Sequence, residues 1–82
     1  MTNGNFNKII SSRIKSLRLL RGLTIEQLAY QSDLSKGGLS EIERNMKEPR
    51  AYTIFKICST LNISMSEFFK FKEIDEFQKE NC

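Results

Sequence analysis

The sequence predicts an all-α fold, a compact bundle of five helices in one small domain. Glycine and proline, the residues that most often interrupt helices, number only four and one among 82 residues. Apolar residues recur at intervals of three and four along most of the chain, which is the spacing of one helix face. No stretch alternates apolar and polar residues in the manner of a half-buried strand, so no sheet is expected.

The first helix is expected at about residues 7–21. Its apolar residues recur at helical spacing and are Ile9, Ile10, Ile14, Leu17 and Leu20. Gly22 follows directly, and glycine is the residue most often found where a helix ends in a left-handed turn. The pattern therefore predicts both the core face of this helix and its end.

The second and third helices are expected close together. Thr24 followed by Gln27 predicts a capping box that opens a helix at about residues 25–32. Ser35 is expected to cap the next helix, at about residues 36–44. The residues expected to face the core are Leu28, Ala29, Leu39 and Ile42. Because only two or three residues connect these helices, they must cross at a steep angle, which predicts a helix-turn-helix.

Two further helices complete the predicted bundle. Pro49 breaks the chain before a helix at about residues 51–61, since proline cannot continue a preceding helix. Ser64 and Glu67 form a second predicted capping box, for a helix at about residues 65–71. The core candidates in the fourth helix are Ile54, Phe55, Ile57, Cys58 and Leu61.

Residues 1–69 form the predicted domain, and residues 70–82 a polar C-terminal tail or an extension of the fifth helix. Three apolar residues, Phe71, Ile74 and Phe77, lie among charged ones in this segment. One interpretation is a dimer-forming extension. The alternatives are a short helix folded onto its own domain, or disorder.

The composition excludes most catalytic and metal chemistry. Histidine is absent, which removes His-based catalysis and the usual zinc sites. Two cysteines 24 positions apart provide neither a metal cage nor a disulfide scaffold. We therefore expect no enzyme activity, no metal, no cofactor and no small-molecule ligand. No apolar run approaches the length of a membrane span, and no signal peptide is recognisable, so a cytoplasmic protein without membrane contact is expected.

Charge is distributed unevenly along the chain. Residues 1–69 contain ten basic and six acidic side chains, a net charge of +4, whereas residues 70–82 have a net charge of −1. A basic body is typical of proteins whose partner carries phosphates, although an ordinary solvated surface has the same composition.

Five short segments together resemble a known family. These segments are SRIKSLR at 12–18, GLT at 22–24, QLA at 27–29, LS at 34–35 and LSEIER at 39–44. In this order the chain is similar, over roughly residues 9–69, to the phage-repressor and Cro-like helix-turn-helix family with the lambda-repressor-like fold. That family includes the controller proteins of restriction–modification systems. The resemblance implies a recognition helix in the major groove of double-stranded DNA and a homodimer on a two-fold operator.

The resemblance also implies roles for individual residues. The residues implied to face base edges are Lys36, Gly37, Ser40 and Glu41. Those implied to contact phosphates are Thr24, Arg44, Lys47 and Arg50, and the implied structural ion pair joins Arg18 to Glu43. The chemistry of two side chains agrees, because a lysine can donate to guanine O6 and N7 and a glutamate can accept from cytosine N4. Alternatively, Glu41 pairs with Arg44 or Lys47 along an exposed helix.

The sequence thus predicts a DNA-binding transcription regulator that acts as a homodimer through occupancy of its operator. A restriction–modification controller, a phage-type repressor and an antitoxin all fit this description. The alternative from another class is a protein-interaction module, or antitoxin-type partner, that keeps the fold with weak or no reading of DNA.

Overall fold

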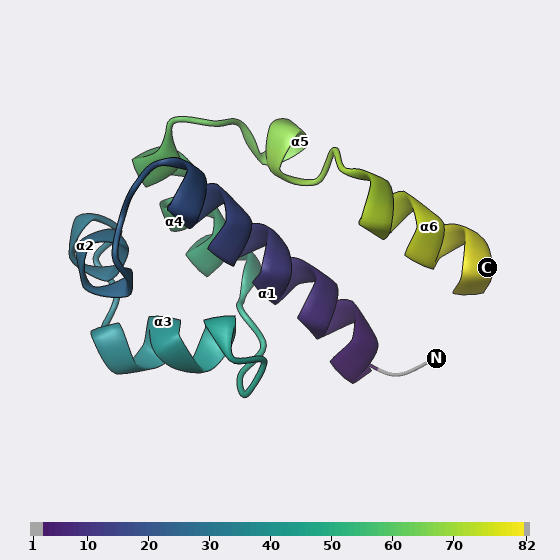
Figure 1. The fold of residues 1–82 in the computed structure, drawn as a ribbon, viewed down its shortest axis with the longest axis horizontal. Helices are drawn as coiled ribbons and strands as arrows, with labels where there is room; N and C mark the ends of the chain where they lie inside the picture. The colour runs from purple at the N-terminus through teal and green to yellow at the C-terminus, as the bar shows by residue number, and fades with distance from the viewer. Residues whose placement is uncertain (1–2, 82) are drawn as a thin grey trace.

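The computed structural model describes residues 3–81, and every regular element in that range is a helix (Figure 1). The helices are α1 (Asn3–Leu20), α2 (Ile25–Gln31), α3 (Lys36–Glu43), α4 (Ala51–Leu61), α5 (Met65–Phe68) and α6 (Lys72–Asn81). In Figure 1, α1 runs through the middle of the molecule, with α2 and α3 on one side of it and α6 on the other. The predicted all-α class and the helix-turn-helix formed by α2 and α3 are confirmed.

The chain after residue 65 differs from the predicted single helix, because the helix expected at residues 65–71 ends at Phe68 and a separate sixth helix follows. Arg13 of α1 binds the backbone at this break. Its Nε donates to the carbonyl of Phe68 at 2.9 Å, and its Nη2 donates to the carbonyl of Glu67 at 2.8 Å. In an unbroken helix these two carbonyls would accept from the amides four residues later.

The helix ends follow the local signals in the sequence. Both capping boxes are confirmed: Thr24 exchanges hydrogen bonds with Gln27, and Ser64 with Glu67. The hydrogen bonds from the backbone and side chain of Ser64 hold the pKa of Glu67 below its ordinary value. Gly22 has a φ of 69°, the left-handed conformation that ends α1.

One apolar core unites α1 to α5. Its buried residues are Ile10, Ile14, Leu28, Ala29, Leu39, Ile42, Ile54, Ile57, Cys58, Leu61 and Phe68. Two predicted core residues are instead exposed: Leu20 to 79% and Phe55 to 51%. Leu20 lies in the last turn of α1, and Phe55 is rotated about 100° from the stripe that begins at Ile54. Burial raises the pKa of the Cys58 thiol, consistent with its place in the core.

The last helix folds back onto the first. The rings of Phe6 and Phe77 are 5.5 Å apart, and the guanidinium of Arg13 lies 4.8 Å from the centre of the Phe71 ring. Phe71 and Ile74 also pack against the core. The apolar residues of α6 are thus used within the chain, as the alternative of a short helix folded onto its own domain required.

Candidate nucleic-acid interface

One face of α3 is buried and the opposite face is open. Lys36, Gly37 and Glu41 are exposed, and Ser40 is half-buried. Gly37, Ser40, Glu41 and Arg44 are separated by three or four residues, so they follow one another along a single stripe of the helix. Three of the four residues implied to face base edges are therefore exposed on α3, and Ser40 lies half-buried between Gly37 and Glu41.

Lys36 is held loosely. Its Nζ lies 3.5 Å from a carboxylate oxygen of Glu26 on α2, and both side chains are largely exposed. Exposed ion pairs of this kind contribute less than about 1 kcal/mol, because water screens both charges. Lys36 can therefore leave Glu26 for a better acceptor at little cost.

The two glycines in the first turn of α3 differ in their surroundings. A Cβ on Gly38 would lie 2.8 Å from the hydroxyl of Ser35, which caps α3 by accepting from the Gly38 amide. A Cβ on Gly37 would meet nothing within 4 Å. The packing of the Ser35 cap therefore explains why residue 38 is a glycine. No contact within residues 3–81 explains the glycine at 37, which leaves open space on the exposed stripe.

The residues implied to contact phosphates surround this stripe. Thr24 caps α2, so its hydroxyl is already used by the Gln27 amide. Lys47 and Arg50 line a hollow beside the N-terminal half of α3. Arg44 donates only a long 3.4 Å hydrogen bond to the Ser40 carbonyl. Within residues 3–81, none of these three basic side chains has an acidic partner within 4.0 Å.

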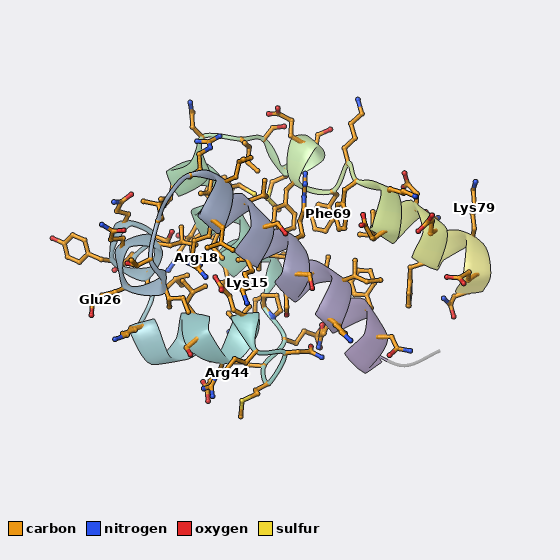
Figure 2. All side chains as sticks on the ribbon, in the orientation of Figure 1. Lys15, Arg18, Glu26, Arg44, Phe69 and Lys79 are labelled. Carbon is orange, nitrogen blue, oxygen red and sulfur yellow. The ribbon has the colours of Figure 1, made fainter. Side chains whose placement is uncertain are left out.

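Arg18 and Glu43 fix α3 to α1. Two hydrogen bonds join them, Nε to Oε2 at 2.7 Å and Nη2 to Oε1 at 3.0 Å. The third donor, Nη1, reaches the carbonyl of Leu23 at 2.7 Å. The side chains are only 9% and 3% exposed, and Figure 2 shows Arg18 inside the molecule, between helices. This geometry is bidentate and shielded, and it leaves little freedom to rotate α3 about its axis.

A second connection, which was not predicted from the sequence, joins the same two helices. The hydroxyl of Ser11 on α1 is buried and donates to the carbonyl of Ile42 at 2.6 Å. Ser11, Ile14 and Arg18 share one face of α1, since they are three and four positions apart. A serine in line with core residues was the available signal, because a buried hydroxyl requires a partner.

The part of the chain that the structure describes contains neither a metal-binding cluster nor a membrane-spanning helix. No group of three or more histidine, cysteine, aspartate or glutamate residues converges there to hold a metal ion. Nor does any helix of residues 3–81 have the length and apolar character that a membrane span requires.

Comparison with known proteins identifies the family. The model of the HTH_3 family, described as helix-turn-helix, matches residues 14–68, which include α2, α3 and the ion pair that orients α3. The chain belongs to the HTH_3 family.

The chain is similar to an HTH-type transcriptional regulator and to a phage immunity repressor. The chain is 38% identical over 64 residues to the regulator SutR of Escherichia coli, covering 78% of this chain and 36% of SutR. It is 37% identical over 57 residues to the immunity repressor of Bacillus phage phi105, covering 70% of this chain and 40% of the repressor. The chain therefore spans well under half the length of these two relatives.

The solved structure of a restriction–modification controller protein matches the chain over most of the length of both proteins. The wild-type restriction–modification controller protein C.Esp1396I aligns with a TM-score of 0.76 at 33% sequence identity. The alignment covers 85% of this chain and 87% of the controller protein. The resemblance to phage repressors and controller proteins that the sequence indicated is thus confirmed.

Breaking the ion pair between Arg18 and Glu43 is expected to cause a large and specific loss of stability. Arg18→Met should lower the free energy of unfolding by about 3 kcal/mol, because it leaves the Glu43 carboxylate buried without its partner. Adding Glu43→Leu should restore part of that loss, since no charge is then stranded. Urea denaturation measures both, with Arg21→Met, which alters an exposed arginine, as the control. Equal stability of the Arg18 and Arg21 variants would show that the pair contributes little.

Replacing Gly37 or Gly38 by alanine is expected to change stability differently at the two positions. Gly37→Ala should raise stability by up to about 1 kcal/mol, because alanine favours the helix and its methyl group has free space. Gly38→Ala should gain nothing or lose stability, since the new methyl group displaces the Ser35 cap. Thermal melting of the two variants checks this. The interpretation fails if Gly38→Ala proves the more stable of the two.

Proposed function

We propose that this chain binds double-stranded DNA in a sequence-specific manner and regulates transcription by occupying its operator. The observation that carries the proposal is the exposed stripe of α3, which is held at a fixed rotation by two buried contacts to α1 and bordered by unpaired cations. A helix with one face pinned and the other open is what insertion into the major groove requires.

Within this proposal, the residues along α3 read base edges. Lys36 donates to guanine O6 and N7, and Glu41 accepts from cytosine N4. A carboxylate near phosphates weakens binding overall, so Glu41 serves discrimination rather than affinity. Ser40 lies between them, and the open space at Gly37 allows the backbone of α3 to approach the DNA closely.

The surrounding residues hold the phosphate backbone. Arg44, Lys47 and Arg50 form no ion pair with any residue of the described range 3–81. Exposed cations of this kind displace counterions from the duplex. Thr24 contributes through the start of α2 rather than through its hydroxyl, because that hydroxyl already caps the helix. The long side chain of Arg50 stands at the start of α4 without forming a side-chain cap, which leaves it available to a phosphate.

We further propose that the chain acts as a homodimer on a two-fold operator, with half-sites about 34–36 Å apart. The fifth helix and the tail were the expected interface, but the apolar residues of α6 pack on α1 instead. Tyr52 and Phe55 on α4 offer an alternative, since their rings stack at 6.1 Å while remaining 67% and 51% exposed. A second copy of the chain would bury this aromatic pair.

If Tyr52 and Phe55 form the dimer interface, a negative charge introduced at residue 55 should separate the two subunits. Phe55→Glu should shift the protein toward a 9.5 kDa monomer, because it places a carboxylate where the second copy would pack. Sedimentation equilibrium at micromolar concentration measures the mass. Tyr30→Glu on α2, at an 85% exposed aromatic residue, is the matched control and should leave the dimer intact. An unchanged mass for Phe55→Glu would place the interface elsewhere, and a monomeric unmodified chain would exclude the dimer.

If α3 reads base edges, substituting one of its residues should reduce the base preference at a single position of the operator. Lys36→Ala should weaken binding by about 1–3 kcal/mol on the preferred duplex and relax preference at one base pair only. Glu41→Gln should raise general affinity, because phosphate repulsion disappears, and should reduce the preference for cytosine at its position. Binding titrations against every single-base variant of one half-site measure both effects, with Lys70→Ala as the control.

Two outcomes would contradict this assignment. An equal loss across all duplex variants would make Lys36 a phosphate anchor rather than a base reader. No affinity for any duplex, together with a flat response to salt, would favour the alternative of a protein-interaction module or antitoxin-type partner.

A further inference from the structure

A second basic surface lies beside α3, outside the helix-turn-helix. It is an open hollow of about 410 Å³ between α1 and the C-terminal end of α3. Its lining residues are Lys8, Ser11, Ser12, Lys15, Glu43, Arg44 and Asn45. We call it the α1–α3 hollow.

The buried contacts between α1 and α3 position the lysines of the α1–α3 hollow. Ser11 donates to the Ile42 carbonyl, two residues before Arg44. Lys8 and Lys15 lie three residues before and four residues after Ser11, so both emerge from the same face of α1. Figure 2 shows Lys15 on the side of α1 that faces α3. The two lysines therefore flank the point where α1 meets α3.

The charge of the hollow is almost entirely uncompensated. Its one acidic lining residue is Glu43, whose side chain is 3% exposed and already bonded twice to Arg18. Among residues 3–81, neither Lys8, Lys15 nor Arg44 has a carboxylate within 4.0 Å. Three cations thus border a space whose hydroxyl and amide groups can also donate hydrogen bonds.

The hollow is continuous with the proposed base-reading stripe. Arg44 lines the hollow and also follows Gly37 and Glu41 along the exposed face of α3. A duplex whose major groove receives α3 continues beyond the C-terminal end of that helix. Its sugar–phosphate backbone would then pass the entrance of the hollow.

We propose that the α1–α3 hollow binds a backbone phosphate of the operator duplex, flanking the bases that α3 contacts. The inference rests on the proposed function and extends it to α1, a helix outside the helix-turn-helix. Lys8, Lys15 and Arg44 supply the charge, and the exposed hydroxyl of Ser12 supplies a neutral donor. The contact adds affinity and fixes the position of α3 along the groove, but it carries no base preference.

The test compares two double variants that remove equal charge. Lys8→Gln/Lys15→Gln empties the hollow of both lysines, and Lys70→Gln/Lys79→Gln removes two exposed lysines outside it. Binding of the chain to its preferred duplex is titrated between about 50 and 200 mM salt. Raising the salt over that range lowers the affinity by about 3.5-fold for each phosphate contact. One such contact in each subunit of a dimer therefore contributes about tenfold to the loss of affinity. Thermal melting checks that both variants fold.

The hollow variant should show a salt response about tenfold smaller than that of the control, with base preferences unchanged. Removing base pairs from the ends of the duplex should weaken the unmodified chain but have no further effect on the hollow variant. Identical behaviour of the two double variants would overturn the inference while leaving the proposed function intact. If the unmodified chain binds no duplex, the phosphate site and the proposed DNA-binding function are both contradicted. If inorganic phosphate raises the melting temperature of the unmodified chain but not of the hollow variant, and affinity for DNA does not depend on duplex length, the hollow is a site for free phosphate and the inference is overturned.

Discussion

The orientation of α3 depends on the buried ion pair between Arg18 and Glu43. An arginine fork and a carboxylate fit each other in one geometry, and shielding from water makes any other arrangement costly. The third arginine donor holds the Leu23 carbonyl, so the same side chain also fixes the entry to α2. With the bond from Ser11 to Ile42, α3 is held to α1 at two successive residues of its last turn. A recognition surface on α3 requires this kind of positional control.

The same pair decides the electrostatics of the surface. Because Arg18 takes up the charge of Glu43, that carboxylate does not pair with Arg44, Lys47 or Arg50, none of which forms an ion pair within residues 3–81. Buried charges in this fold thus stabilise the position of α3, whereas exposed charges remain available to a partner. The buried pair fixes geometry and responds little to salt, whereas Arg44, Lys47 and Arg50 are exposed and would respond strongly. The compact α6, folded onto α1 through Phe77, carries the acidic excess away from this face.

Features set by a few neighbouring residues could be predicted from the sequence, and features set by distant contacts could not. The boxes at Thr24 and Ser64 and the turn at Gly22 each depend on residues within five positions, so local chemistry was sufficient. At the break after α5, two carbonyls accept from Arg13, more than 50 residues earlier, and no local pattern predicts this contact. The contact from Ser11 is equally distant in sequence, across 31 positions. For the candidate site, the family resemblance supplied the roles along α3, while the cationic hollow required the packing of α1 against it.

The most direct test of a fixed helix that reads DNA is selection from a random duplex pool. The chain is mixed with duplexes of random sequence, and the bound fraction is recovered, amplified and sequenced over several rounds. The account predicts two related half-sites in inverted orientation, with centres one helical turn apart, as expected for two copies of α3 on one face of the duplex. A pool that stays random while binding persists would contradict it, because the surface would then hold phosphates without reading bases.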